Sequence, residues 1–294
     1  MQLDPIAVEA GLRLEALTAT GSTNAEARAR ARAGESGPLW ITAAEQTQGR
    51  GRRGRNWISP PGNLYASLLL SDPAPHERAP ELAFVAALAV RDAILARAPA
   101  LAPKLQFKWP NDLLLSAKKC AGILIEGEVG MEGELGGGSA GGRLMVIVGI
   151  GVNCVTHPTT MSGAVTLRAA SPPPGDDRVA VAFPATDLLA EGADVSPPQL
   201  FESLSATMCR RIAQWDRGGG FPAILGDWLS SASGIGEKIT VRDGSTTLHG
   251  RFVGLDQSGR LVLGLADGCL KKISAGDVFP LSVRGWRRIW SAWT

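Results

Sequence analysis

Hydrophobic and polar positions divide the chain into two regions with different periods. Up to about residue 232, short apolar runs alternate with longer stretches of helical period. The runs predict strands over 13–17, 39–45, 64–70, 105–109, 119–126 and 144–152, and helices over 23–33, 80–98, 198–215 and 221–230. Strands and helices interleaved in this way predict an α/β (α+β) fold.

A second region begins near residue 233, where short apolar strands alternate with turn-forming pairs. Strands are expected over 238–242, 247–255, 261–265 and 270–273. The pairs between them are Asp243-Gly244, Ser258-Gly259 and Asp267-Gly268, which favour tight hairpins. We therefore expect a small C-terminal β-barrel domain over 233–282, followed by a Trp- and Arg-rich tail over 283–294.

Local signals refine the first region. Thr23 and Glu26 have the spacing of a capping box, which predicts that Thr23 caps its helix. The glycine-rich segment 127–142 predicts a hairpin tip. Segment 155–183 contains three consecutive prolines and little periodicity, so we interpret it as a surface insertion.

The segment 49–57, GRGRRGRNW, concentrates positive charge. Its first seven residues hold four arginines and three glycines. Glycines let a backbone approach a ligand closely, and guanidinium groups suit phosphate and carboxylate oxygens. We expect repulsion to keep this loop disordered until an anion binds, with Trp57 closing over a flat base or anchoring the end of the loop. A solvated basic loop or a nucleic-acid patch fits the composition equally well.

Two familiar phosphate motifs do not fit this loop. Residues 49–54 match G-x-G-x-x-G, but the prolines at 60 and 61 prevent the helix that a dinucleotide site needs. A P-loop needs Lys and Ser or Thr after its last glycine, whereas Arg55 and Asn56 stand there.

Composition narrows the function classes. The 294 residues carry a net charge of +2, with 45% hydrophobic and 20% charged residues, which is ordinary for a soluble globular protein. The four cysteines form no C-x-x-C pair and the three histidines have no metal-ligand spacing, so no zinc site is expected. The N-terminus lacks the pattern of a signal peptide, and no apolar run is long enough to span a bilayer. A cytoplasmic enzyme is the expectation.

Three further motifs follow the arginine loop in order: K-W-P-N-D at 108–112, K-C-A-G-I-L at 119–124 and G-I-G-V-N at 149–153. Together with Gln46 and the strand after the loop, they resemble the biotin protein ligases over about residues 14–281. The resemblance implies a mixed-sheet catalytic domain of the biotin/lipoate ligase type over 1–232, followed by a small β domain. It indicates the form without an N-terminal DNA-binding domain.

The resemblance also implies a reaction in two steps. The biotin carboxylate attacks the α-phosphate of ATP, giving biotinyl-AMP and pyrophosphate, and a lysine of a biotin carboxyl carrier protein then accepts the biotinyl group. Such chemistry depends on positioning and electrostatics and needs no nucleophile from the enzyme. Magnesium is expected with ATP, without assigned ligands. No specific DNA and no membrane partner are expected, and a homodimer is left open.

Site residues follow from the same resemblance. Lys119 is the expected catalytic cation, with Arg52 beside it; Asp112 would orient the acceptor lysine or help a metal, although a turn-forming aspartate fits its position equally well. The residues expected to bind biotin are Ser22, Thr23, Asn24, Gln46, Gly49, Arg50, Arg52, Lys119 and Gly122. Those expected to bind ATP or the adenylate are Arg50, Arg52, Arg53, Arg55, Trp57, Asn111, Lys119 and Asn153. Asn153 could equally end a strand, and Asp187 replaces the serine of the family's A-T-S-L segment.

Two alternatives remain to be weighed. Lipoate ligases and octanoyltransferases share the catalytic fold, but their R-R-x-x-G-G-G motif has no counterpart here, because Gly218-Gly219-Gly220 follows a helix. A biotin-responsive DNA-binding repressor would need a helix-turn-helix ahead of the catalytic match, which already begins by Leu14.

Overall fold

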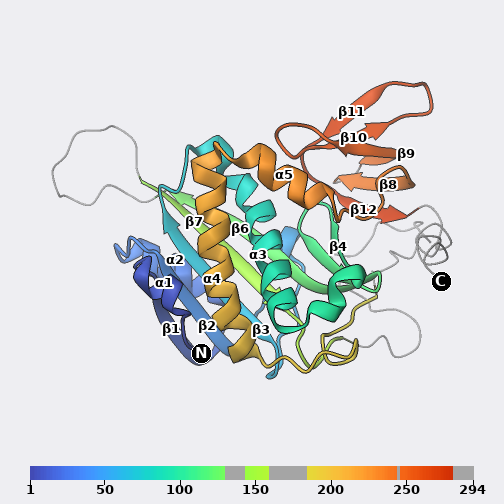
Figure 1. Ribbon diagram of the computed structural model, residues 1–294. Coiled ribbons are helices and arrows are strands. Elements are labelled where there is room, and N and C mark those ends of the chain that lie inside the picture. The colour runs from blue at the N-terminus through green and yellow to red at the C-terminus, as the bar shows by residue number, and fades with distance from the viewer. Residues whose placement is uncertain (130–142, 159–183, 244–245, 281–294) are drawn as a thin grey trace, which may run out of the picture.

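Two β-sheets organise the chain in the computed structural model, which describes residues 1–129, 143–158, 184–243 and 246–280 (Figure 1). The larger sheet has seven strands in the order β1-β2-β3-β7-β6-β5-β4. Strands β1 and β2 run parallel, and every other neighbouring pair is antiparallel. The expectation of a mixed sheet is therefore confirmed. The strands are β1 (Arg13–Thr20), β2 (Leu39–Gln46), β3 (Leu64–Ser71), β4 (Leu105–Lys108), β5 (Asp112–Leu115), β6 (Lys118–Val129) and β7 (Leu144–Val152).

Helices cover both faces of this sheet. Helix α2 (Thr23–Arg32) packs on one face, whereas α3 (Leu82–Arg97) and α4 (Pro197–Trp215) pack side by side on the other, with α5 (Phe221–Leu229) near their ends (Figure 1). Successive strand residues point to opposite faces, so Leu68 joins the core under α3 and α4, and Leu69 joins the core under α2. Burial on both faces explains why the strands are continuous apolar runs.

The smaller sheet is antiparallel and has the order β11-β10-β9-β8-β12. Its strands are β8 (Lys238–Asp243), β9 (Thr246–Leu255), β10 (Leu261–Gly264), β11 (Leu270–Ile273) and β12 (Asp277–Pro280). The Trp109 indole N–H donates to the carbonyl of Gly259, at 2.9 Å. A Cβ at Gly259 would lie 2.7 Å from the Phe84 ring, so the two parts of the chain are in close contact there.

Local structure departs from the sequence expectations in several places. The capping box at Thr23 and Glu26 is wrong: Ser22 is the N-cap residue, and Glu26 instead accepts a hydrogen bond from the Thr20 hydroxyl. Helix α3 begins at Leu82 because residues His76–Glu81 form a 3₁₀ turn. The sequence patterns missed three short elements, which are α1 (Pro5–Glu9), β5 and β12.

Several expectations fall on residues that the structure does not describe. The predicted hairpin tip at 127–142, the insertion at 155–183 and the tail at 283–294 lie wholly or largely outside the described ranges. The domain boundary at residue 232 stays a prediction. Within the described ranges, no helix is both long and apolar enough to cross a membrane.

Candidate functional site

A polar cluster joins the start of α2 to the end of β2. The Gln46 side-chain oxygen accepts hydrogen bonds from the Thr23 backbone N–H, at 2.8 Å, and from the Thr23 hydroxyl, at 3.1 Å. The Ser67 hydroxyl lies 2.7 Å from Thr23 Oγ1 and 2.6 Å from Asn24 Oδ1. Ser22, Thr23, Asn24 and Ser67 are all buried. The structure thus brings together the residues at 22–24 and Gln46 and adds Ser67, which sequence reasoning missed; the contact of this cluster with biotin stays a prediction.

Glycines of β6 and β7 form a flat surface beside this cluster. A Cβ at Gly149 would lie 2.2 Å from Asn24 Oδ1, and one at Gly151 would lie 2.7 Å from Trp57 Nε1. Gly122, which pairs with Gly151 across the two strands, would place a Cβ 3.1 Å from the Trp57 ring. Trp57 therefore rests on the sheet where side chains are missing. The spacing of two residues between Gly149 and Gly151 was the sequence signal for a shared face.

The arginine loop returns to the sheet at its two ends. The Trp57 backbone N–H donates to the Gly49 carbonyl, at 2.9 Å, and a Cβ at Gly49 would lie 2.3 Å from the Trp57 carbonyl oxygen. Only glycine fits at position 49 for this reason. Arg50 is exposed and forms a backbone bridge with Asn56. Trp57 anchors the end of the loop, whereas its predicted contact with a base stays a prediction.

Asp112 lies between two lysines at the ends of three neighbouring strands. Its Oδ1 lies 2.5 Å from Lys119 Nζ, and its Oδ2 lies 3.1 Å from Lys108 Nζ. Strand pairing produces this arrangement, because Asp112 faces Lys108 on β4 and Gly122 on β6. Lys119 Nζ also lies 5.2 Å from the centre of the Trp57 ring, within reach of a cation–π contact. The predicted catalytic cation therefore lies against both Asp112 and the glycine surface.

Burial and charge act against each other in this cluster. Burial tends to raise the pKa of Asp112, but Lys119 and Lys108 outweigh it and hold that pKa well below its usual range. Burial lowers the pKa of Lys108, an effect that Asp112 opposes. Asp112 is thus an ionised carboxylate at neutral pH, held by two cations.

Arg52 joins the cluster from the loop. Its Nη1 donates to Asn111 Oδ1, at 3.1 Å, and Asn111 Nδ2 donates to the Ile123 carbonyl, at 2.5 Å. Burial lowers the pKa of Arg52, and the charges of Asp277 and Asp112 oppose that effect. Arg52 and Asn111 therefore belong to one site with Asp112 and its lysines.

Arg53 and Arg55 point elsewhere. Arg53 Nη2 lies 2.7 Å from Asp243 Oδ1, and Arg55 Nη2 lies 2.6 Å from Asp277 Oδ1, both on the C-terminal sheet. The expectation that repulsion keeps the loop disordered until an anion binds did not include these two carboxylates, which offset the charges of Arg53 and Arg55. Their predicted contacts with the nucleotide stay predictions.

Asn153 has a structural role in the described chain. Its side-chain amide donates to the Thr186 carbonyl, at 3.0 Å, and its backbone N–H donates to the Cys120 carbonyl, at 2.8 Å. Thr186 in turn donates its backbone N–H to the Lys119 carbonyl, at 3.0 Å. Asn153 thus supports the segment beside Lys119, and its contact with a nucleotide stays a prediction.

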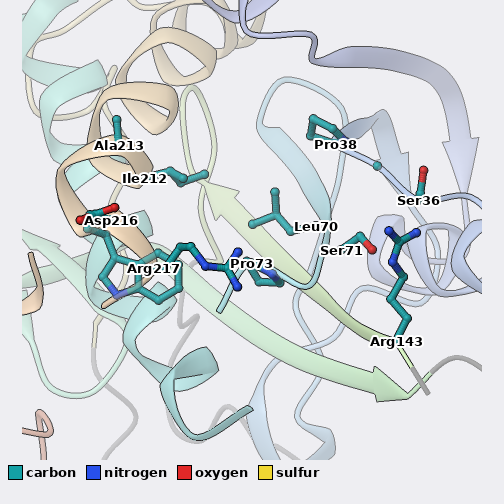
Figure 2. Close-up of a pocket in the computed structure, with 12 residues that line it drawn as sticks. Ser36, Pro38, Leu70, Ser71, Pro73, Arg143, Ile212, Ala213, Asp216 and Arg217 are labelled. Carbon is teal, nitrogen blue, oxygen red and sulfur yellow. The ribbon is translucent and has the colours of Figure 1, made fainter. Parts of the chain in front are cut away.

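A surface depression of about 460 Å³ lies away from these residues (Figure 2). Leu70 at the end of β3, Arg143 before β7, and Trp215 and Arg217 at the end of α4 contribute to its lining. None of the residues that the sequence predicted to bind biotin or ATP lines it. The polar cluster, the glycine surface and the Asp112 cluster therefore define the candidate site.

Comparisons with known proteins match both parts of the chain. Residues 19–141 match the model of the biotin/lipoate A/B protein ligase family, and residues 234–279 match that of the biotin protein ligase C-terminal domain. A solved biotin protein ligase from Aquifex aeolicus, in complex with biotin and ATP, shares the fold with a TM-score of 0.66 at 23% identity, covering 91% of this chain and 97% of that one. A biotin protein ligase from Leishmania major, in complex with biotinyl-5-AMP, has a TM-score of 0.55 at 27% identity, covering 90% and 99%.

A curated relative extends the similarity over nearly the full sequence. It is a biotin–[acetyl-CoA-carboxylase] ligase from Paracoccus denitrificans, 41% identical over 265 residues, which are 90% of this chain and 98% of the relative. Similarity of this extent, together with the two domain models, means that the chain belongs to the biotin protein ligase family.

Proposed function

We propose that the chain joins biotin to ATP, forming biotinyl-AMP, and transfers the biotinyl group to a lysine of an acetyl-CoA carboxylase carrier protein. The observation that carries the proposal is the pairing of Asp112 with Lys119, at 2.5 Å, with Arg52 bound to the adjacent Asn111. This arrangement places the positive charges of Lys119 and Arg52 close together, next to the glycine surface. A carboxylate and a phosphate can approach there only if their charges are neutralised.

Biotin would lie along the polar cluster and the glycine surface. Thr23 and Gln46 offer donors and acceptors for the polar groups of biotin, and Ser67 extends this set. The apolar chain of biotin would lie along Gly122 and Gly151, between the cluster and Lys119, in the space that the Trp57 ring covers in this structure. The biotin carboxylate would then reach Lys119.

In the first step, Lys119 would neutralise charge on the carboxylate and the α-phosphate, while Arg52 would hold the phosphate in place. A carboxylate oxygen forms a bond to the α-phosphorus, and the bond to pyrophosphate breaks. In the second step, the neutral acceptor amine attacks the biotinyl carbonyl and an amide forms. AMP leaves with the electrons of the broken anhydride bond, and the nitrogen loses a proton to water. Asp112 would hold the Lys119 ammonium in place during both steps, because its own charge persists at neutral pH.

Magnesium would enter with the phosphates of ATP and not through a cage of protein carboxylates. Among the described residues, no group of three or more His, Cys, Asp or Glu side chains could hold a metal. Both oxygens of Asp112 already contact lysines. Magnesium commonly binds substrate phosphates with few protein ligands, so this arrangement fits a nucleotide-borne ion.

Lipoate is the second substrate to consider, because the matched catalytic model covers biotin and lipoate ligases alike. The match to a biotin protein ligase C-terminal domain favours biotin. Incubation of the chain with ATP and either biotin or lipoate, followed by mass spectrometry, tests the proposal. We expect biotinyl-AMP with biotin and no adenylate with lipoate; a lipoyl adenylate formed at an equal or higher rate would overturn the choice of biotin.

A further inference from the structure

The guanidinium groups of the arginine loop point in two directions, toward the candidate site and toward the C-terminal sheet. Arg52 turns to Asn111 and the Asp112 cluster. Arg53, the next residue, and Arg55 turn to the C-terminal sheet. One loop thus touches both the candidate site and the second sheet.

The backbone of the loop explains the division. Arg53 has φ 58° and ψ 33°, in the left-handed region that a residue with a side chain seldom adopts. The Gly51 N–H donates to the Arg55 carbonyl, at 2.7 Å, and closes the turn. A reversal at Arg53 places adjacent arginines on opposite sides. Such strained conformations persist where surrounding contacts hold them, and the side-chain contacts of Arg53 are with the C-terminal sheet.

Asp277 is the residue at which the loop and the C-terminal sheet meet. Its Oδ1 lies 2.6 Å from Arg55 Nη2, and its Oδ2 lies 3.6 Å from Arg53 Nη1. It pairs with Arg242 in the β8–β12 ladder, which fixes its backbone. The Asp277 side chain is 23% exposed, whereas that of Asp243 is 54% exposed, so solvent screens the Asp277 contacts less.

The field of Asp277 also reaches the other side of the loop. Burial lowers the pKa of Arg52, and Asp277 is the strongest of the charges that oppose this lowering. The same carboxylate opposes the lowering of the Lys108 pKa. The charge of Asp277 therefore acts on two cations of the candidate site and also pairs with two arginines of the loop.

We propose that Asp277 is a positioning residue for adenylate formation. By holding Arg53 and Arg55 on the C-terminal sheet, it maintains the turn that presents Arg52 to the phosphate of ATP. The kinetic part of this proposal rests on the proposed function, whereas its conformational part does not.

Trypsin cleavage tests the conformational part, because trypsin cuts after the arginines of the loop itself. In Asp277→Asn, we expect cleavage within residues 50–55 to be about threefold to tenfold faster, the range that corresponds to losing one or two exposed ion pairs. Asp277→Glu should restore slow cleavage. Asp267→Asn is the matched control, because Asp267 is an exposed carboxylate in the turn between β10 and β11 and accepts a hydrogen bond from the Cys269 backbone N–H. Cleavage of Asp277→Asn at the wild-type rate would overturn the proposal.

Steady-state kinetics tests the second part. Asp277→Asn should raise the KM for ATP by about threefold to tenfold with a smaller change in kcat, and Asp277→Glu should reverse the effect. Added salt should reduce the difference between wild type and variant, because it screens exposed ion pairs. An unchanged KM would overturn the proposal.

A wild-type chain without adenylate formation would contradict the proposed function, and the trypsin result would still decide the role of Asp277. If Asp277→Asn does not fold, Arg55→Gln removes the 2.6 Å pair from the loop side and takes its place in the trypsin test, with cleavage followed after Arg50, Arg52 and Arg53.

Discussion

Two neighbouring lysines have different surroundings. Lys119 lies against Asp112 and the Trp57 ring, whereas Lys118 is exposed and pairs with Glu191 at 3.3 Å. Loss of a cation from a site that stabilises developing charge typically costs about 10²–10³ in rate. Loss of an exposed cation costs almost nothing.

We therefore expect Lys119→Ala to lower the rate of pyrophosphate release by about 10²–10³, because it removes a cation that neutralises the transition state. Lys118→Ala, the matched control, should keep the wild-type rate. Circular dichroism checks that both variants are folded. Near-normal pyrophosphate release by Lys119→Ala would show that Lys119 is a solvated residue that does not take part in the reaction.

Asp112 links stability to pH. Its pKa is lowered in the folded chain, so it stabilises the fold above its unfolded pKa of about 4 and loses this contribution as the pH falls toward its folded pKa. Asp112→Asn leaves Lys108 and Lys119 without their carboxylate. We expect the variant to be less stable than wild type at pH 7 by about 3 kcal/mol or more, because breaking a buried ion pair leaves uncompensated charge.

Urea unfolding between pH 7 and pH 3 measures this effect. The difference in unfolding free energy between wild type and Asp112→Asn should narrow as the pH falls below about 4, where the unfolded carboxyl is protonated. A difference that stays constant across this range would show that the charge of Asp112 does not carry the stabilisation.

At the scale of the element, we expect the arginine loop to retain the adenylate in the site after it has formed. Among the described contacts of the loop arginines, only that of Arg52 is with the candidate site, through Asn111. Arg53 and Arg55 pair with carboxylates of the C-terminal sheet. A loop that closes over an adenylate holds its phosphate and excludes water. Arg52→Gly should therefore still form biotinyl-AMP but release it into the medium, where it biotinylates unrelated lysines.

Chromatography of the free adenylate and a blot for biotin on a bystander protein measure this leakage. Retention equal to wild type would mean that Arg52 is a solvated loop residue. Complete loss of adenylate formation would place Arg52 with Lys119 in the chemical step.

The glycine surface on β6 and β7 also has a function that a substitution can test. A Cβ at Gly151 would lie 2.7 Å from Trp57 Nε1, so Gly151→Ala must displace the indole that ends the arginine loop. We expect weaker binding of biotin and ATP, measured by calorimetry, with the fold retained. Gly127→Ala is the control on the same strand pair, because a Cβ there would meet no atom within 4 Å. Equal binding by both variants would contradict a role for this surface.

At the scale of the whole molecule, the charge distribution bears on DNA binding. The net charge is +2, and two of the loop arginines pair with carboxylates of the C-terminal sheet. Ahead of β1, the described chain contains one helix, α1, of five residues. A helix-turn-helix consists of two helices, whereas residues 1–12, as described, contain one.

We expect no sequence-specific DNA binding. Any weak attraction of duplex DNA to Arg50 should fade steeply with salt, because it depends on counterion release. Electrophoretic mobility shifts at low and physiological salt test this expectation. A tight complex with one duplex that survives physiological salt would contradict it.

The sequence alone determined the large features of this protein. Apolar runs flanked by turns predicted most strands, since a strand buried on both faces must be apolar throughout. Motifs at 49–57, 108–112 and 119–124 indicated the family and the region of the site. Apolar runs and short motifs both consist of residues that are close in sequence, so they can be read without knowledge of the fold.

Only the tertiary structure decided which polar and charged side chains meet. Ser67 joins Thr23 across 44 positions, and Arg55 meets Asp277 across 222 positions. No local pattern encodes such pairs, because they depend on strand order and on the approach of the second sheet. The short strands β5 and β12 were missed for the same reason: their pairing partners, and not their own four residues, make them strands. The sequence therefore determined the elements and the family, whereas the fold decided that Asp112 holds Lys119 and that Asp277 holds the arginine loop.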